Sequence, residues 1–265
     1  RKLTSLRGMV VGFIGSGNMA AGMARGWKAA EAAGPEKMLF TDSGSGRAAS
    51  LAAEVGGEAV VTNEELVSRS DVVVLALKPA GLMLAAEAAK QGEVVISMLG
   101  ATSEQKLREA MPDVDVFRLM PNLGVEKGRG TLCLSHHDSI EASQVEKVTS
   151  LLSLLGKVVE MTDEDMDAAT AVMGCTPAYF ALAAEAIAEA GAKDGLDPRL
   201  ALSLVVESMA GAAELLGSYS PGALREAVAS PGGSTEAGLI ALDEHGAADA
   251  FRAAVEASLD RMRGT

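Results

Sequence analysis

The stretch Val10-Val11-Gly12-Phe13-Ile14-Gly15-Ser16-Gly17-Asn18-Met19-Ala20 decides the fold, because a short apolar strand runs directly into a Gly-x-Gly-x-x-Ala turn. This arrangement is typical of the start of a dinucleotide-binding βαβ unit. Gly15 permits the tight turn, Gly17 lets the backbone approach a pyrophosphate, and Ala20 lets the next helix lie close to the strand.

A helix that begins near Asn18 directs its first backbone amides, and the positive end of its dipole, at bound phosphates. The alternative is a turn of the same shape that holds no ligand. We expect the first of these, with a cofactor-binding segment made of Gly15, Ser16, Gly17, Asn18 and Met19.

Composition limits the classes of partner. Apolar residues make up 48% of the 265 residues, enough for a buried core in one large or two smaller domains. Acidic residues outnumber basic ones by 36 to 23, which gives a net charge of -13, and Lys and Arg form no cluster. We therefore expect a small-molecule substrate and neither nucleic acid nor an anionic membrane as a partner.

The cysteines and the termini indicate a cytoplasmic protein. Cys133 and Cys175 are far apart and form no CxxC pair, which is typical of a thiol-reduced compartment. No apolar run approaches the ~20 residues of a membrane span, and no charged-then-apolar leader is found. Residues 1–8 precede Met9 and are interpreted as a short extension or tag remnant.

Strands and helices alternate in the first part of the chain. The expected strands are 10–14, 37–41, 72–77, 94–98, 114–119, 130–135 and 157–161. The expected helices are 20–33, 46–55, 63–68, 82–89, 103–111 and 140–155. Strands that are apolar on both faces, such as 72–77, favour a sheet covered by helices on each side. The pattern predicts a doubly wound α/β domain of the Rossmann type over residues 1–162.

Residues 163–265 carry only helical periodicity. One long helix or a kinked pair is expected over 163–192, with the break near Gly174-Cys175-Thr176-Pro177 because proline lacks an amide donor. Further helices are expected at 200–216, 222–228, 235–244 and 247–263. Several of them are apolar on more than one face, so we predict that this domain packs against a second copy of itself.

The ends of the expected strands supply further cofactor candidates. Asp42, after the second strand, favours the free 2'-hydroxyl of NAD, whereas Ser43, Ser45 and Arg47 form a polar nest suited to a 2'-phosphate. An Asp-Ser-Gly turn that caps the next helix is equally consistent with this sequence. The choice between NADPH and NADH stays open.

Two more strand ends face the same edge of the expected sheet. Leu77, Lys78 and Pro79 end one strand, and Lys78 offers a charged donor to the cofactor. Asn122 follows Pro121 and can hydrogen-bond a nicotinamide ribose or amide, although a simple turn uses the same residues.

Glycines and hydroxyls gather again near the C-terminus. Ser230-Pro231-Gly232-Gly233-Ser234-Thr235 precedes a helix and offers amides and short donors to a carboxylate, with a tight connection between helices as the alternative. We expect no metal, because His136, His137 and His245 belong to no ligand set. Cys175 has no nearby histidine and is interpreted as a small buried residue.

Taken together, these segments resemble the pyrroline-5-carboxylate reductase family. The resemblance rests on the opening Gly-rich turn, Leu77-Lys78-Pro79, Arg118-Leu119-Met120-Pro121-Asn122, Thr176-Pro177-Ala178-Tyr179 and, most specifically, Ser230-Pro231-Gly232-Gly233-Ser234-Thr235. It implies a Rossmann domain followed by a helical dimerisation domain, with the helices of two subunits interlocked. Dimers of family members often assemble into larger rings.

The resemblance also implies a reaction and a set of site residues. Hydride transfer from NADPH or NADH, with a slight preference for NADPH, reduces the cyclic imine of 1-pyrroline-5-carboxylate to L-proline, the last step of proline biosynthesis. The backbone of Gly232, Gly233 and Ser234, with the Ser230 hydroxyl, would hold the substrate carboxylate. Thr235 would hydrogen-bond the substrate nitrogen, and its role is orientation, since a threonine has no suitable pKa to act as an acid.

Two segments depart from the family pattern. Leu123-Gly124 stands where Thr-Pro is usual, and Cys175-Thr176 stands where Ser-Gly is usual. These changes leave open a related cyclic imine or keto acid as substrate. A dinucleotide-sensing protein without turnover is the third hypothesis, and the intact glycine pair with Thr235 argues against it.

Overall fold

The computed structural model describes residue 6 and residues 8–264, so most of the predicted extension lies outside the described residues. Contacts divide the chain into two compact units. The N-terminal unit comprises Arg1–Gly174 and Leu259–Thr265, and the helical unit comprises Cys175–Ser258. The domain boundary predicted from the sequence pattern at residue 162 stays a prediction. The division by contacts lies further along the chain and includes the helix Met166–Met173 in the N-terminal unit.

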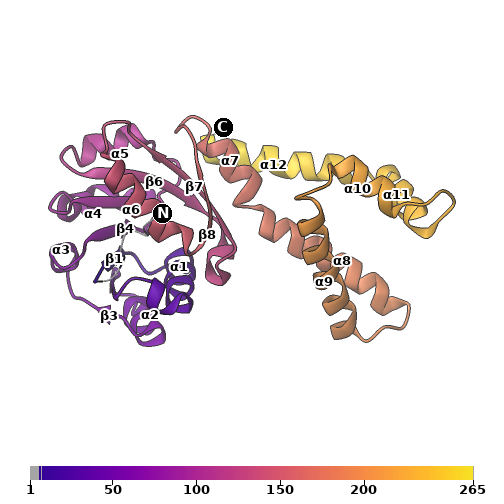
Figure 1. Ribbon diagram of the computed structural model, residues 1–265, viewed down its shortest axis with the longest axis horizontal. Helices are drawn as coiled ribbons and strands as arrows, with labels where there is room; N and C mark the ends of the chain where they lie inside the picture. Colours follow the sequence, from indigo (N-terminus) through magenta and orange to yellow (C-terminus); the bar gives the residue numbers. More distant parts are fainter. Residues whose placement is uncertain (1–5, 7, 265) are drawn as a thin grey trace. The chain divides into compact units, whose positions relative to one another are not determined.

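A single sheet forms the centre of the N-terminal unit (Figure 1). Its strand order is β3-β2-β1-β4-β5-β6-β7-β8, with all neighbours parallel except β6 and β7. The strands are β1 (Val10–Ile14), β2 (Lys37–Thr41), β3 (Glu58–Ala59), β4 (Val72–Leu75), β5 (Val94–Ser97), β6 (Asp115–Pro121), β7 (Gly130–His136) and β8 (Gly156–Glu160). The first six strands follow the order of a doubly wound dinucleotide-binding fold, which confirms the predicted fold class.

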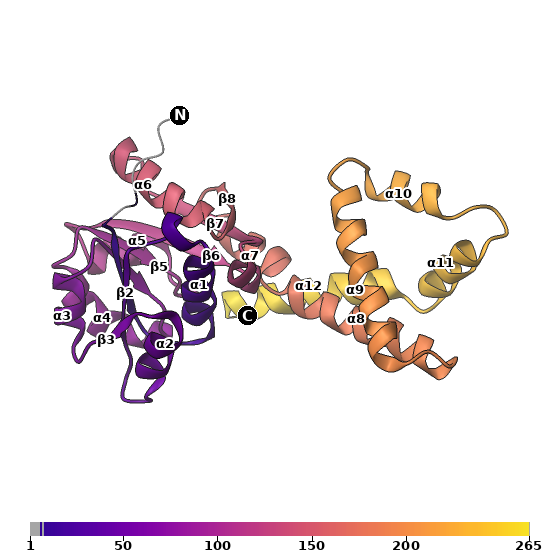
Figure 2. The same cartoon turned by 60° about the horizontal axis from the view of Figure 1, so that its bottom comes forward.

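Helices cover both faces of this sheet (Figure 2). One face packs on α1 (Asn18–Ala29), α2 (Arg47–Val55) and α6 (Ala142–Ser153), and the other on α3 (Asn63–Ser68), α4 (Leu82–Ala89) and α5 (Glu104–Ala110). Short 3₁₀ turns are η1 (Glu31–Ala33), η2 (Pro79–Gly81) and η3 (Leu123–Lys127). All seven predicted strands are present, and only the two-residue β3, which follows two glycines, was missed.

Helix α1 illustrates how the sequence builds this layer. Ala20, Met23, Ala24 and Trp27 recur at helical spacing and are all buried. The Trp27 ring packs beside Phe13 of β1, and its Nε1 donates to the Leu151 carbonyl of α6 at 3.0 Å. The helix is shorter than the predicted 20–33, because the chain turns into η1 after Ala30.

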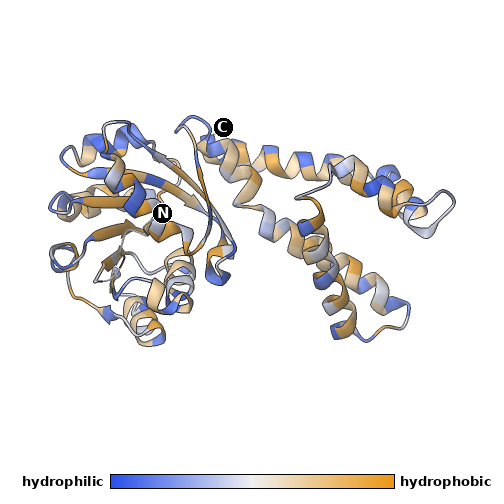
Figure 3. Ribbon diagram, viewed as in Figure 1, coloured by the Kyte–Doolittle hydropathy of each residue, from blue (hydrophilic) through white to orange (hydrophobic). Residues whose placement is uncertain are grey.

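The helical unit contains α8 (Thr176–Lys193), α9 (Pro198–Leu215), α10 (Pro221–Val228), α11 (Ser234–Glu244) and most of α12 (Ala247–Arg263). Its buried hydrophobic residues, among those described, are Ala184, Ala188 and Ala201. Larger side chains such as Leu182 and Ile187 are exposed, and Figure 3 shows apolar residues distributed along α8 and α9. Among the described residues of the helical unit, the apolar faces predicted for these helices are therefore left exposed.

The expected kinked pair is present as α7 (Met166–Met173) and α8, with the break at Gly174 and Cys175 before Pro177. Taken together, α7 and α8 (Met166–Lys193) are the one helical segment, within the described residues, that is long and apolar enough to span a membrane, with a mean hydropathy of 1.4. We expected no membrane-spanning segment because the sequence has no uninterrupted apolar run of sufficient length. Mean hydropathy is a different criterion, since it averages over charged residues such as Glu185. Only 17% of the most apolar part of this segment is buried, so most of its side chains are exposed to solvent in a single chain.

Candidate functional site

The turn between β1 and α1 packs closely against the ends of β2 and β4. Gly15 has φ of +100°, and a Cβ there would lie 2.5 Å from the Ala76 carbonyl oxygen that follows β4. The Gly15 amide and the Ser16 hydroxyl both donate to the Thr41 carbonyl of β2, at 3.1 and 3.0 Å. Glycine is therefore required at position 15 by backbone conformation and by space.

Helix α1 begins with open backbone donors. Gly17 is its N-cap in extended conformation, and a Cβ on Gly17 would meet no heavy atom within 4 Å. The amides of Asn18 and Met19 precede the first intrahelical hydrogen bond and are free to bind an anion. Open space above a glycine at a helix N-terminus is what the close approach of a pyrophosphate needs.

A cavity of about 910 Å³ lies at this turn. Its position between the ends of β1 and β4 is the point where the strand order of the sheet reverses. Ten of the predicted cofactor residues line it: Gly15, Ser16, Gly17, Asn18, Met19, Asp42, Ser43, Arg47, Leu77 and Lys78. Further residues of the lining were not predicted from the sequence as cofactor ligands: Thr41, Asn63, Met98, Gly100 and Met120. Ser45, which the sequence placed in the polar nest, also lines the cavity.

The Asp42 carboxylate caps its own loop. It accepts from the amides of Gly44 (2.7 Å), Ser45 (2.9 Å) and Ala48 (2.7 Å). The hydrogen bond from Ala48 is the main reason why the pKa of Asp42 lies below its usual value, and those from Gly44 and Ser45 add to it. The capping alternative is thus realised, and the exposed side chains that this loop presents to the cavity are those of Ser43, Ser45 and Arg47.

The end of β4 supplies the opposite wall. Leu77 is half-buried and Lys78 is exposed, and both line the cavity. Pro79 begins η2, whose turn closes with a hydrogen bond from the Gly81 amide to the Lys78 carbonyl at 2.9 Å. Pro79 is outside the lining of the cavity, so its part is to shape the turn that follows Lys78.

Asn122 has the environment of the turn alternative and not that of a cofactor ligand. Its Oδ1 accepts from the amides of Gly124 (3.2 Å) and Thr131 (3.1 Å), and its Nδ2 donates to the Met173 carbonyl at the end of α7 (3.1 Å). It is absent from the described lining of the cavity, whereas its neighbours Met120 and Pro121 are part of it. The side chain is used to fix η3, β7 and α7 together, so the structure does not bring it to the cofactor cavity.

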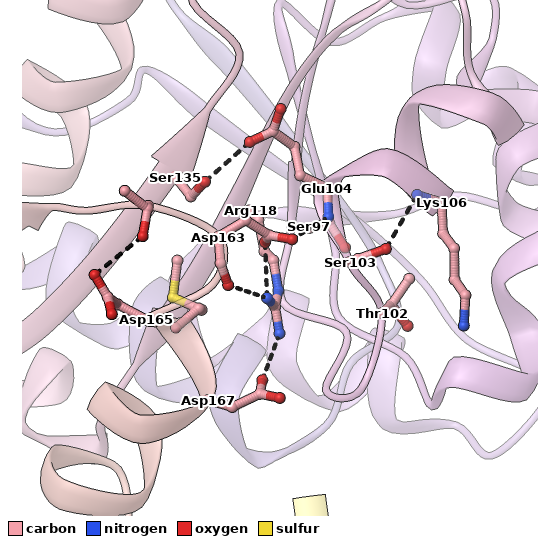
Figure 4. A network of polar contacts seen from close by, with 12 residues as sticks. Ser97, Thr102, Ser103, Glu104, Lys106, Arg118, Ser135, Asp163, Asp165 and Asp167 are labelled. Atoms are coloured by element: carbon pink, nitrogen blue, oxygen red, sulfur yellow. Dashed lines mark hydrogen bonds and ion pairs between the residues drawn. The ribbon is translucent and has the colours of Figure 1, made fainter. Parts of the chain in front are cut away.

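An ion cluster around one buried arginine holds the first turn of α7 (Figure 4). Arg118 of β6 is 4% exposed, and its guanidinium bonds Asp163 Oδ1 at 2.7 Å and Asp167 Oδ1 at 3.0 Å. Asp163 Oδ2 also accepts from the Glu104 amide, and the Glu104 carboxylate accepts from the Ser135 hydroxyl. Sequence reasoning overlooked this cluster, although an arginine inside the apolar strand Phe117-Arg118-Leu119-Met120 signals a buried partner.

The predicted substrate segment forms one compact turn in the helical unit. Pro231 and Gly232 are the central residues of a β-turn closed by the Gly233 amide and the Ser230 carbonyl at 2.9 Å. Gly232 has φ of +72°, as the third position of a type II turn requires. Helix α11 then starts at Ser234, so the amides of Ser234 and Thr235 lie in its first turn and are free of intrahelical bonds.

The structure thus brings all five predicted substrate residues together and distinguishes between their amides. The Gly233 amide is used to close the turn, and the Gly232 amide donates to Glu236 Oε2 at 2.7 Å. The donors left for a carboxylate are the amides and hydroxyls of Ser234 and Thr235, together with the hydroxyl of the exposed Ser230. Over the described range 8–264, no group of three or more His, Cys, Asp or Glu residues is placed to hold a metal ion.

Family models match both halves of the chain. Residues 163–265 match the model described as pyrroline-5-carboxylate reductase dimerisation, and residues 10–100 match the model described as NADP oxidoreductase, coenzyme F420-dependent. A pyrroline-5-carboxylate reductase from Synechocystis is 33% identical over 258 residues, which cover 96% of this chain and 97% of the relative. This chain belongs to the pyrroline-5-carboxylate reductase family.

Other members of the reductase family agree in sequence and structure. The enzyme of Pseudomonas aeruginosa is 34% identical, covering 94% of this chain and 93% of its own. The structure of Plasmodium falciparum pyrroline carboxylate reductase with NADP bound has a TM-score of 0.86 at 26% identity and covers 97% of both chains. The Streptococcus pyogenes enzyme has a TM-score of 0.86 at 27% identity, covering 97% of this chain and 99% of its own. The resemblance stated from the sequence is confirmed.

Proposed function

We infer that this protein reduces 1-pyrroline-5-carboxylate to L-proline with NADPH or NADH. The observation that carries the inference is the match over nearly the whole chain to pyrroline-5-carboxylate reductases from bacteria and plants. The Gly15 turn and the cavity at its edge support a pyridine nucleotide, because they offer the backbone donors and the open approach that a pyrophosphate needs.

The proposed roles of the residues follow from their local geometry. Reduced nicotinamide supplies the hydride when it is bound. The first amides of α1, at Asn18 and Met19, hold the pyrophosphate, and Lys78 adds a charged donor. The Ser234 and Thr235 amides hold the substrate carboxylate at the positive end of α11. The Thr235 hydroxyl orients the ring nitrogen, whose protonated form is the better hydride acceptor, so that the imine carbon is presented for reduction.

Initial rates test the activity directly. Purified protein is expected to oxidise NADPH or NADH only when 1-pyrroline-5-carboxylate is present and to form L-proline. The two cofactors measured side by side decide the preference, for which Arg47 and Ser43 favour NADPH. A series of imine acids of different ring size is the control: higher kcat/KM for the six-membered ring would overturn the substrate assignment. Tight cofactor binding without turnover would instead support the dinucleotide-sensing hypothesis.

Thr235→Ala tests the proposed orienting role. Turnover is expected to fall about 10- to 100-fold through loss of substrate alignment, while the Kd of the cofactor stays within about two-fold, because Thr235 belongs to the helical unit. Steady-state kinetics and a fluorescence titration of the cofactor measure the two effects. Collapse of cofactor binding would show that Thr235 is misplaced.

We propose a homodimer formed through the C-terminal helices. A groove of about 1100 Å³ runs along α8 and α9 and is lined by apolar residues that include Leu182, Leu202 and Val206. Exposed apolar surface of this kind is typical of an interface with another chain. Sedimentation velocity distinguishes the dimer from a monomer, and it also shows whether dimers join into a larger ring.

The same features support a cytoplasmic enzyme without a macromolecular partner of another kind. The net charge of -13 disfavours nucleic acid and anionic membranes. The exposed apolar stretch of α8 is accounted for by a second copy of the chain. Cell fractionation, with recovery of the activity in the soluble fraction, tests this proposal.

A further inference from the structure

The turn before α11 is held by a side chain that the substrate prediction did not include. Glu236 is the third residue of α11, and its carboxylate bends back to accept from the Gly232 amide at 2.7 Å. That amide lies at the centre of the type II turn, in a residue whose φ is +72°. Glu236 stands where the carboxylate of a capping box stands, but it binds the amide of Gly232, one residue before the N-cap Gly233, and so reaches further back over the helix start.

The contact removes one donor from the site and orients the others. The Gly233 amide is already bound to Ser230, and a Cβ on Gly233 would lie 2.8 Å from Ser230 Oγ, so the turn is closed tightly on that side. With Gly232 also bound, the direction of the peptide planes that lead into Ser234 and Thr235 is fixed. Their amides are the donors left at the positive end of the helix.

We propose that Glu236 is a positioning residue for substrate binding, which fixes the Ser230–Gly233 turn so that the Ser234 and Thr235 amides are aimed at the substrate carboxylate. This inference rests on the proposed function. Glu236 contributes two effects of opposite sign. Its hydrogen bond orders the turn, while its negative charge lies near the place of an anionic ligand and repels it.

Two substitutions separate these effects. Glu236→Ala removes the acceptor and the charge, whereas Glu236→Gln keeps an acceptor oxygen and removes only the charge. In the Ala variant the KM for 1-pyrroline-5-carboxylate is expected to rise about five-fold, as for loss of one ordinary intramolecular hydrogen bond. In the Gln variant that KM is expected to equal or fall below the wild-type value. The kcat and the KM for the reduced cofactor are expected to stay within about two-fold in both. Glu244→Ala, at the other end of α11, is the matched control.

Hydrogen exchange provides a measurement that needs no substrate. Mass spectrometry of a peptide covering residues 229–237 is expected to show faster exchange in Glu236→Ala and restored protection in Glu236→Gln. Equal KM values in wild type and both variants, with unchanged exchange, would overturn the role of Glu236. A similar rise of KM in both variants would also overturn it, because it would assign the effect to charge. Failure of the wild type to reduce 1-pyrroline-5-carboxylate would refute the proposed function, and the exchange experiment would still decide whether Glu236 holds the turn.

Discussion

The two units of the chain satisfy their apolar side chains in different ways. In the N-terminal unit Phe13 and Trp27 are at most 1% exposed, whereas in the helical unit Leu182 is 67% and Ile187 is 58% exposed. Both units are rich in apolar residues. Composition therefore indicates how much apolar surface a unit has, but not whether that surface is buried within the unit or against another subunit. The first unit completes its core from its own elements, and the second leaves large apolar side chains exposed, which a second subunit would cover in the proposed dimer.

The largest effect is expected from a charge placed on the exposed helical face. Leu182→Glu would leave an unpaired carboxylate in the proposed interface, at a cost of about 3–5 kcal/mol, which is enough to convert the dimer to monomer. Sedimentation velocity measures the change. Val61→Glu is the matched control, since Val61 is 92% exposed in the N-terminal unit and is expected to leave the oligomer intact. A dimer that survives Leu182→Glu would mean that the helical unit buries α8 in some other way.

A truncation in the self-contained core comes next. Trp27→Ala removes the ring that packs beside Phe13 and the bond to the Leu151 carbonyl. The free energy of unfolding is expected to fall by about 3–4 kcal/mol, as measured by urea denaturation followed by circular dichroism, with the oligomer unchanged. Trp27→Phe, which keeps most of the packing, should lose clearly less. Equal losses of unfolding free energy in the two variants would mean that Trp27 stabilises the fold mainly through its hydrogen bond to the Leu151 carbonyl.

Two glycines in the same turn separate folding from binding. Gly15→Ala is expected to cost about 1–3 kcal/mol of stability, because φ is +100° and the Ala76 carbonyl lies in the way. Gly17→Ala meets open space, so the unfolding free energy should stay within about 0.5 kcal/mol, while the Kd of the cofactor rises. Thermal unfolding and a cofactor titration of both variants provide the measurements. If Gly17→Ala bound the cofactor as well as wild type, the pyrophosphate would lie elsewhere.

The smallest effect is expected at the Asp42 cap. Asp42→Ala should cost about 1 kcal/mol at neutral pH, as for loss of a helix cap. The folded-state pKa is lowered, so the contribution is complete above the unfolded pKa of about 4 and disappears as the pH falls through the folded value. The unfolding curves of wild type and Asp42→Ala should therefore converge in acid, whereas Asp42→Asn should retain part of the cap. A constant difference down to the lowest pH would contradict this account.

Most of the N-terminal unit was predictable because its signals are local. The strand and turn around Gly15, and the strand end at Lys78, rest on a few adjacent residues whose conformations are fixed by glycine, proline and apolar runs. The two-residue β3 was missed because its pairing with β2 is decided by the tertiary fold and not by a run of its own.

Long-range side-chain bonds explain the remaining differences. Asn122 lies at the predicted sheet edge, but its Nδ2 donates to the Met173 carbonyl and its Oδ1 accepts from the Thr131 amide, and no local pattern relates these two partners to it. The bond from the Gly124 amide belongs to the turn that the sequence offered as the alternative. The bond from the Gly232 amide to Glu236 is local, but it does not have the spacing of a capping box. The N-cap of α11 is Gly233, which has no side chain to return the bond, so a search for Ser/Thr-x-x-Glu patterns does not find this contact.

The position of Trp27 also makes this protein easy to observe. It is the one tryptophan in the sequence and lies in the N-terminal unit, whereas the tyrosines at 179 and 219 both belong to the helical unit. Indole emission therefore reports on the first unit alone, whereas far-ultraviolet circular dichroism reports on the helices of both. A denaturant titration of the unlabelled protein followed by both signals can show whether the two units unfold together or in sequence.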